Sequence, residues 1–200
     1  PRLLLLDEPF SAIDAQVRME LRRWLRNLHD DFGSTTLMVT HDQDEALAIA
    51  DRVVVIDAGR VQQYGTPSVI VDEPATEFVS RFMGEVNVFS GEARDGIARF
   101  GALQVRSHIT GPVHVVIRAY DMKFWQDDLG IAVVERVLPV GDRVRVEAVL
   151  DDGVAIFGWF PRRSTLLPGV VPGTRIAVAV SQSRVWPAVT HARESVTESP

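Results

Sequence analysis

Short apolar runs alternate with helical periodicity over the first third of the chain. Leu3–Leu6 is a continuous apolar run followed by two carboxylates, which is typical of a strand buried on both faces. Asp14 can cap a helix that ends at Gly33 and whose apolar residues recur at steps of three and four: Val17, Leu21, Trp24, Leu25 and Leu28. A strand, a helix and two further strands are predicted next, at residues 35–40, 44–50, 52–56 and 60–63. Because strands and helices alternate, we expect a parallel sheet with right-handed crossovers.

The pattern changes near Met83 and Gly84, where we place a domain boundary. A short helix over residues 74–83 is predicted to link the domains 1–83 and 84–187. Short valine-rich runs then alternate with turns, among them a hairpin turn predicted at Asp95–Gly96. The strict alternation over Arg143–Glu147 predicts a strand with one buried face. Strands are predicted at residues 87–93, 97–100, 103–106, 113–118, 131–138, 143–150, 154–160 and 175–180. Many short strands with frequent turns favour a small β-barrel. Residues 188–200 are expected to form a flexible tail.

Composition narrows the class of protein. The chain is 46% hydrophobic and 24% charged, as is usual for a globular protein with a buried core. No apolar run approaches the roughly 18 residues that a membrane-spanning helix needs. Cysteine is absent, which excludes disulfides, thiolate zinc sites and a cysteine nucleophile. The net charge of −6 arises in the first 83 residues, and neither part has the basic excess of a nucleic-acid-binding protein.

Two sets of residues have an alternative interpretation. Aromatic side chains of the second part could stack on nucleobases, but we expect most of them to pack in the core or on strand faces: Trp125, Phe157, Trp159 and Phe160. A run of arginines on the first predicted helix could face lipid, but a solvated helix face is the preferred interpretation: Arg18, Arg22, Arg23 and Arg26. We therefore expect no nucleic-acid partner.

Three polar residues follow the ends of the first two predicted strands. Asp7 and Glu8 end the first, and His41 lies just past the second. In parallel sheets, ligands bind at the carboxyl ends of the strands. One carboxylate could help to hold a hard cation such as Mg²⁺, and the other could orient or deprotonate an attacking water. Taken singly, such carboxylates are more often solvated in a loop and such a histidine is more often structural, but their position at strand ends favours a site.

The same segments resemble motifs of ATP-binding cassette (ABC) ATPases. Residues 3–9 (LLLLDEP) look like the Walker B strand, residues 11–14 (SAID) like the D-loop, and residues 39–46 (VTHDQDEA) like the switch-histidine loop. The family's order continues through residues 51–61 and 64–67.

This resemblance implies roles for five residues. Asp7 would hold Mg²⁺ through water, Glu8 would be the general base in ATP hydrolysis, and His41 would contact the γ-phosphate. Ser11 and Asp14 would belong to the nucleotide-binding region where two ATPase subunits communicate. These roles, and the use of ATP and Mg²⁺, are implied by the family resemblance alone.

Two parts of the family's machinery are missing from the sequence. A P-loop has the form Gly-x-x-x-x-Gly-Lys-[Ser/Thr], but Lys123 is the only lysine and follows Met122. The ABC signature and the glutamine loop would precede Pro1. We therefore expect a piece of a longer protein that neither binds ATP tightly nor hydrolyses it alone. In residues 1–83, the missing neighbour of the sheet should leave apolar surface and an unpaired strand edge exposed, with a risk of dimerisation.

The second part resembles the TOBE domain of importer ATPases, an OB-like barrel. Residues 78–87 look like the connector into that domain, and residues 115–121 like its Arg-Pro-x-Asp stretch, with Ala119 in place of the proline. Residues 136–147 and 184–187 are nearest to the sulfate/thiosulfate importer ATPases. Molybdate, iron, sugar and polyamine importers remain alternatives.

The resemblance also implies partners and a location. An importer ATPase is peripheral on the cytoplasmic face of the bacterial inner membrane, where it forms a homodimer beneath membrane-spanning permease subunits. It makes no direct contact with the solute. The fold expected overall is a partial α/β ABC ATPase domain followed by an all-β TOBE domain. The alternative from another functional class is a regulatory and dimerisation module.

Overall fold

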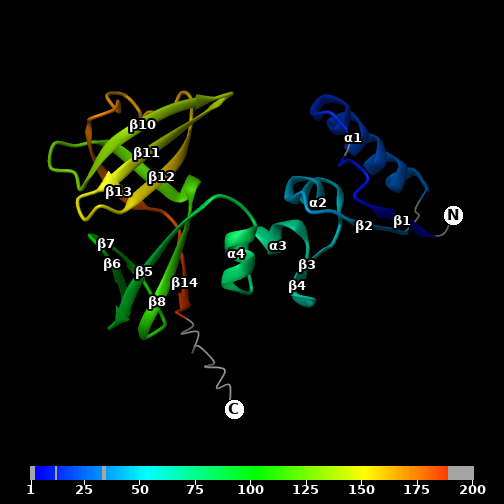
Figure 1. The fold of residues 1–200 in the computed structure, drawn as a ribbon, viewed down its shortest axis with the longest axis horizontal. Coiled ribbons are helices and arrows are strands. Elements are labelled where there is room, and N and C mark those ends of the chain that lie inside the picture. Colours follow the sequence, from blue (N-terminus) through cyan, green and yellow to red (C-terminus); the bar gives the residue numbers. More distant parts are fainter. Residues whose placement is uncertain (1–2, 12, 33–34, 189–200) are drawn as a thin grey trace, which may run out of the picture. The chain divides into compact units, whose positions relative to one another are not determined.

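The computed structural model describes residues 3–11, 13–32 and 35–188, which divide into two compact units, residues 1–83 and 84–200 (Figure 1). The first unit is mixed α/β and the second consists mainly of antiparallel sheets. The expected end of the first helix at Gly33 and nearly all of the expected tail, residues 188–200, lie outside the described residues. Across the described part, no helix combines the length and apolar character needed to cross a membrane.

Two separate pairs of strands form the sheets of the first unit. β1 (Leu3–Asp7) pairs in parallel with β2 (Thr35–Val39), and the crossover between them is α1 (Ala15–Phe32). β3 (Val53–Asp57) pairs instead with β4 (Arg60–Gly65) in an antiparallel hairpin. The expected parallel sheet is therefore limited to β1 and β2, because no described residue of β3 pairs with β2.

Three short helices complete the first unit. The structure has α2 at Gln43–Ile49, α3 at Pro67–Asp72, which was not predicted, and α4 at Glu77–Phe82, which is shorter than the helix predicted over residues 74–83. Thr66 caps α3, with Pro67 in the first turn where its missing N–H costs nothing, and Thr76 caps α4. The Thr-Pro pair was the sequence signal for α3, and it was missed.

The core cluster of the first unit is small and lies on one face of β3. Its buried members come from β3 and the segments of the short helices: Val53, Val55, Ile70, Val79 and Met83. Large apolar side chains on β1, β2 and the other face of β3 are exposed to solvent: Leu3, Leu5, Leu37, Val39, Val54 and Ile56. Among the described residues, β2 has a partner on one edge only. The prediction of exposed apolar surface and an unpaired edge is thus confirmed, although the expected burial of β1 on both faces is wrong.

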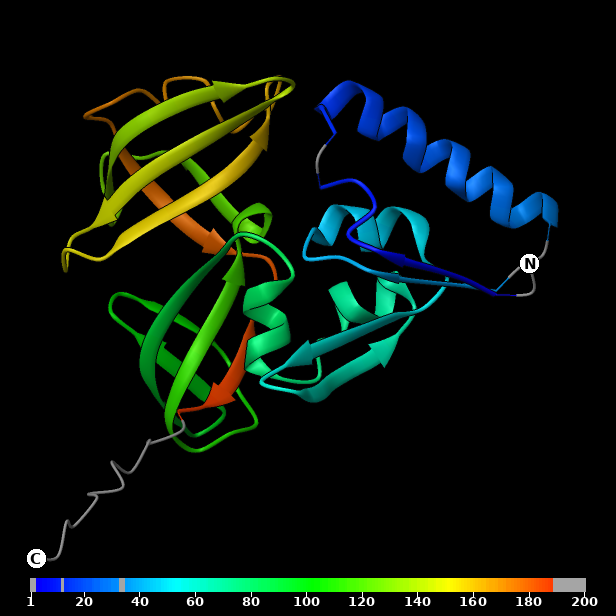
Figure 2. The same ribbon diagram turned by 45° about the vertical axis from the view of Figure 1, so that its right-hand side comes forward.

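The second unit contains two five-stranded sheets (Figure 2). Their strand orders are β14-β8-β5-β6-β7 and β12-β11-β10-β13-β9. The bounds are β5 Val86–Arg94, β6 Ile97–Phe100, β7 Leu103–Arg106, β8 Gly111–Arg118, β9 Met122–Gln126, β10 Ala132–Val140, β11 Arg143–Leu150, β12 Ala155–Pro161, β13 Arg175–Val180 and β14 Arg184–Pro187. A 3₁₀ turn, η1 (Ala119–Asp121), precedes β9, and the apolar pattern predicted neither of these two elements.

Both sheets of the second unit contribute to one core. Fully buried residues come from β8 and β9 as well as from β11 and β13, including Ile117, Phe124, Val146 and Ile176. The strict alternation of β11 buries every second residue, as predicted from Arg143–Glu147. At the predicted hairpin turn, Asp95 and Gly96 have φ of 54° and 80°, the left-handed conformation that such two-residue turns require.

Candidate functional site

The parallel register of β1 and β2 brings two of the predicted site residues to the same sheet edge. Asp7 is the register partner of Val39, so the chain leaves both strands at the same level. The Glu8 N–H donates to the Val39 carbonyl over 2.9 Å, which extends the ladder by one residue. Glu8 and His41 therefore follow the two strand ends side by side.

Glu8 and His41 are in direct contact. The His41 backbone N–H donates to Glu8 Oε1 over 2.9 Å, and His41 Nδ1 lies 2.8 Å from the same oxygen. This hydrogen bond raises the pKa of His41, with a smaller contribution from the negative charge of Glu8. If Nδ1 donates to Glu8, Nε2 is left for a second partner, and the His41 side chain is 80% exposed. The pair thus places a carboxylate and an accessible imidazole together at a strand end.

The backbone at Glu8 is strained and held by the following loop. Glu8 has φ of 46°, a left-handed conformation that non-glycine residues rarely adopt. Ser11 donates to the Glu8 carbonyl from its N–H over 3.3 Å and from Oγ over 3.1 Å. Strain of this kind costs of order 1–3 kcal/mol and is often found at functional sites. The loop therefore fixes the direction in which the Glu8 carboxylate leaves the strand.

The other predicted site residues lie close by, with different surroundings. Asp7 is exposed at the end of β1, one residue before Glu8. Asp14 caps α1, because its Oδ1 accepts from the Gln16 and Val17 N–H groups over 3.1 Å and 3.0 Å. The predicted cap is confirmed, and the carboxylate of Asp14 is engaged in it. The structure thus joins Glu8 to His41 and to Ser11.

The arginines of α1 were predicted to be solvated, and for three of the four this is wrong. Arg18, Arg22 and Arg26 are spaced by four residues and share the helix face turned to α2. Arg26 Nη1 donates to the Ile49 carbonyl over 2.9 Å and pairs with Asp51 over 2.7 Å. The four-residue spacing places these three arginines in one row along the helix, here called the arginine stripe. Spacing alone does not show that a second polar surface faces this stripe. Arg23, off this stripe, is exposed as predicted.

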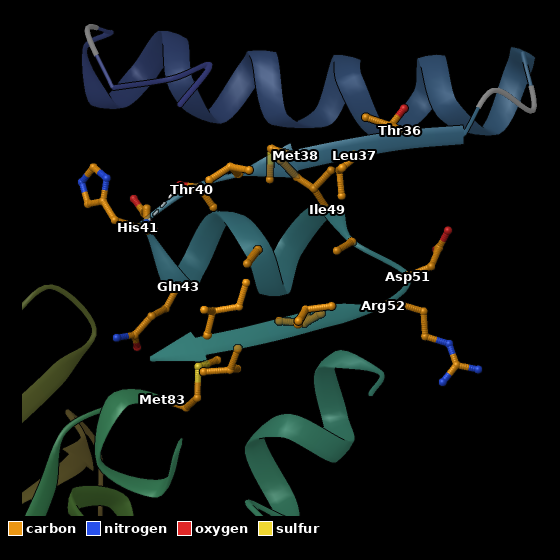
Figure 3. A pocket seen from close by; sticks show the side chains of 18 of the residues that line it. Thr36, Leu37, Met38, Thr40, His41, Gln43, Ile49, Asp51, Arg52 and Met83 are labelled. Atoms are coloured by element: carbon orange, nitrogen blue, oxygen red, sulfur yellow. Dashed lines mark hydrogen bonds between the residues drawn. The ribbon is translucent and has the colours of Figure 1, made fainter. Parts of the chain in front are cut away.

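An apolar cavity of about 630 Å³ lies between β2 and β3 (Figure 3). Its lining includes Met38 of β2, Ile49 of α2 and Met83. His41 lies at one end of it and Arg52 at the other. Among the described residues, β2 and β3, which both line this cavity, do not pair with each other.

The residues at the strand ends fit one side of a metal–phosphate site. Asp7 provides carboxylate oxygens, the kind of ligand that Mg²⁺ takes together with phosphate oxygens and water, and Glu8 provides a carboxylate beside it. No three His, Cys, Asp or Glu side chains converge as a metal cage within the described residues. Lys123, the only lysine, belongs to the second unit and donates to the Tyr120 carbonyl over 2.8 Å. The carboxylate side of such a site is therefore present, and a phosphate-binding lysine loop is not.

The aromatic residues considered for base stacking are used within the second unit. Phe160 is buried, with 3% of its surface exposed. The guanidinium of Arg145 lies 4.1 Å from the ring centroid of Phe157, and that of Arg143 lies 5.2 Å from the ring of Trp159. These rings are therefore stacked on this chain's own arginines.

Comparison with known proteins gives consistent relatives. No protein-family model matches the chain. The sulfate/thiosulfate import ATP-binding protein of Burkholderia mallei is 40% identical over 196 residues, which cover 94% of this chain and 56% of that protein. A second such protein, from Agrobacterium fabrum, is 42% identical over 192 residues, covering 94% of this chain and 55% of the relative. The chain thus spans about half the length of the curated relatives it matches. Among solved structures, the cytoplasmic molybdate-binding protein ModG matches 50% of this chain and 95% of its own, with 15% identity and a TM-score of 0.41.

Proposed function

We propose that this chain, which is homologous to roughly the C-terminal half of the sulfate/thiosulfate import ATP-binding proteins, belongs to an ATP-hydrolysing importer subunit. In that subunit it supplies the catalytic base. The observation that carries the proposal is the contact between Glu8 and His41 at the ends of β1 and β2. Both residues lie in segments that resemble the Walker B and switch-histidine motifs. The proposal concerns the complete subunit, because the phosphate-binding loop is not in this sequence.

Glu8 is the general base of the proposed reaction. Its contacts with His41 both use Oε1, so Oε2 can accept a hydrogen bond from water and orient it for attack on a phosphate. The strained turn at Glu8, held by Ser11, keeps this carboxylate in a fixed direction. Phosphoryl transfer depends on positioning and charge stabilisation by the protein, and fixing the base in advance contributes to the positioning.

His41 is the proposed contact for the terminal phosphate. Because Glu8 raises the pKa of His41, a larger fraction of His41 is protonated at a given pH than of an isolated histidine. Protonated imidazole donates from both nitrogens, so Nε2 can donate to a phosphate oxygen while Nδ1 stays on Glu8. Asp7 would hold Mg²⁺ through a water molecule, and the ion supplies neutralisation of the phosphate charge when bound.

The remaining roles concern the second subunit, the membrane and the solute. We propose that Ser11 and Asp14 lie where a second copy of the complete subunit completes the nucleotide site. The partners would be permease subunits, with the protein peripheral on the cytoplasmic side of the bacterial inner membrane. Sulfate and thiosulfate are the proposed solutes, since these are named for the relatives. The second unit is proposed to be a TOBE domain with a regulatory role.

An extended protein tests the catalytic assignment. Joining this chain to the N-terminal half of the Agrobacterium fabrum relative should give ATP hydrolysis. Glu8→Gln in that protein should lower kcat by about 10²–10⁴-fold, because a general base is lost while the shape is kept. Glu20→Gln, an exposed carboxylate on α1, is the matched control and should leave kcat unchanged. Wild-type hydrolysis by Glu8→Gln would refute the role of Glu8.

Two further measurements separate the remaining interpretations. Titration of this 200-residue chain with ATP and Mg²⁺ should show no micromolar binding, because the sequence has no phosphate-binding loop. Micromolar affinity would refute this expectation. Uptake of radiolabelled sulfate, thiosulfate and molybdate by cells carrying the extended protein with its permease tests the solute, and uptake of none would refute an importer role.

The second candidate is a regulatory and dimerisation module. It is favoured by the large core cluster of the second unit, whose buried residues all lie between Phe89 and Ile176. Light scattering on residues 84–188 would show a dimer if this function is correct, and a monomer at all concentrations would speak against it.

A further inference from the structure

A single arginine links the loop after Glu8 to the turn that carries His41. Arg18 Nη2 donates to the Ile13 carbonyl over 2.9 Å. On the other side, Arg18 Nη1 lies 3.6 Å from Asp42 Oδ2, and its Nε lies 4.0 Å from Glu45 Oε1. The planar guanidinium thus spans two segments that are far apart in the sequence, with nitrogens directed to both.

One turn further along α1, Arg22 holds the same two carboxylates. Arg22 Nη2 donates to Asp42 Oδ2 over 3.1 Å and to Glu45 Oε1 over 3.0 Å. Glu45 is 3% exposed, so its charge would be costly without these partners. Thr40 Oγ1 donates to the other oxygen of Glu45 over 2.8 Å. The buried carboxylate therefore connects the arginines directly to the residue before His41.

The turn around His41 is fixed on both sides by this network. Asp42 caps α2, since its Oδ1 accepts from the Glu45 N–H over 3.1 Å. The Asp42 N–H in turn donates to Thr40 Oγ1 over 3.0 Å. The residues on either side of His41 are thus tied to one another, to Glu45 and, through it, to α1. His41 itself is 80% exposed on its side chain, so its position depends on the backbone that carries it.

We propose that Arg18 and Arg22 are positioning residues that lock the turn Thr40–Asp42 to the loop Ser11–Asp14 and so hold His41 against Glu8. For its effect on ATP hydrolysis this inference rests on the proposed function, whereas the mechanical link does not. A shift of Ile13 would be transmitted through the Arg18 guanidinium to the turn.

The protonation of His41 in the full 200-residue chain measures this link without ATP. The imidazole signals can be followed by NMR against pH, with His41 assigned by the signal that disappears in His41→Gln. Removing a nearby positive charge would by itself raise the pKa of His41. Loss of positioning would weaken the hydrogen bond to Glu8 and lower the pKa instead. The two explanations therefore predict opposite signs.

We expect Arg18→Ala and Arg22→Ala to lower the pKa of His41 toward that of an ordinary histidine. Exchange of the His41 backbone N–H, which donates to Glu8, should become about tenfold faster or more. Arg23→Ala removes an equal charge from the exposed face of the same helix and should change neither quantity. An unchanged or raised pKa in both alanine variants would overturn the proposal.

A conservative variant keeps the test valid if an alanine variant fails to fold. Arg18→Lys retains the charge and the aliphatic stem, but one ammonium cannot reach Ile13 and the two carboxylates at once. We expect a fall in the pKa of His41 smaller than with alanine, and wild-type values would overturn the coupling role of Arg18. Failure of Glu8→Gln to slow the extended enzyme would refute the proposed function while leaving these NMR results intact, so the two failures are distinguishable.

Discussion

The two units of this chain differ in how completely they bury their apolar residues. Among its described residues, the second unit has a core of 20 buried residues, most of them on its two sheets. The described residues of the first unit form a core of five, two separate strand pairs and a row of exposed leucines and valines. Yet the carboxylate–histidine contact lies in the less complete unit. Completeness of the core and location of the chemistry are therefore separate properties of this chain.

This difference in burial shows what a continuous apolar run indicates about a strand. Leu3–Leu6 has the sequence of a strand covered on both faces, and only one face is covered by the described residues. Leu5 is 64% exposed, as is expected of a surface that belongs against another segment. In the second unit, by contrast, β8 buries Val113, Val115 and Ile117 completely. Its strands find their partners within the chain.

The largest expected effect concerns the core of the second unit. Phe124 is fully buried, and its ring centroid lies 5.4 Å from that of Phe160. Phe124→Ala should lower the free energy of unfolding of this unit by about 3–5 kcal/mol, because a cavity replaces the ring. Guanidinium denaturation followed by tryptophan fluorescence measures this, because three of the four tryptophans lie in the second unit. The matched change in the first unit, Leu37→Ala at a residue 60% exposed, should cost less than about 0.5 kcal/mol. Equal losses at the two positions would contradict the comparison.

Much of the fold and part of the site could be predicted from local patterns. The alternation of β11, the Asp95–Gly96 turn and the Asp14 cap each follow from a few neighbouring residues. The meeting of Glu8 and His41 was also predictable, because the ends of parallel neighbours lie at one edge. These features need no knowledge of distant packing.

The remaining features depend on which surfaces meet, and the sequence pattern does not specify this. Arg18 and Arg22 look like solvated helix residues until Glu45, far along the chain, turns out to be buried against them. The separation of β3 from β2 could not be predicted from the alternation of strands and helices, because that alternation does not specify which strands pair. A helix was expected over residues 74–83, but the cap at Thr76 shortens it. Local periodicity does not contain this information.

An intermediate effect is expected on self-association through the first unit. Leu5 and Leu37 are register partners on the uncovered face of β1 and β2, and both are exposed. Leu37→Lys should reduce concentration-dependent association, because a charge on this face opposes its burial against a second copy. Analytical ultracentrifugation over micromolar concentrations measures the change in average mass.

The second unit supplies the control for this experiment. Val140, at the end of β10, is 54% exposed, and its register partner is the charged Arg143. Val140→Lys should leave the average mass unchanged. A wild-type chain that stays monomeric throughout, or an equal response of the two lysine variants, would show that the uncovered face of β1 and β2 does not drive association.

The smallest effect concerns pH, and it should be confined to the first unit. The hydrogen bond to Glu8, and then the charge of Glu8, raise the pKa of His41 above 6.5, so folding favours the protonated form. This contribution to stability is complete below the pKa of the unfolded state and is lost as the pH rises through the higher pKa of the folded state. The helical circular dichroism signal reports on the first unit, because α1–α4 all lie there. Its thermal midpoint should be slightly higher at mildly acidic than at mildly basic pH.

Variants at both partners decide whether the pair causes this difference. His41→Gln and Glu8→Gln each remove the charged hydrogen bond and should shrink the pH dependence of the helical midpoint by the same amount. His114→Gln, on β8 of the second unit, should leave it as in the wild type. If the two site variants kept the full pH dependence, other titrating groups would be responsible. Because His41 is largely exposed, solvent screening keeps the effect small, and the equality of the two variants is a stricter test than its size.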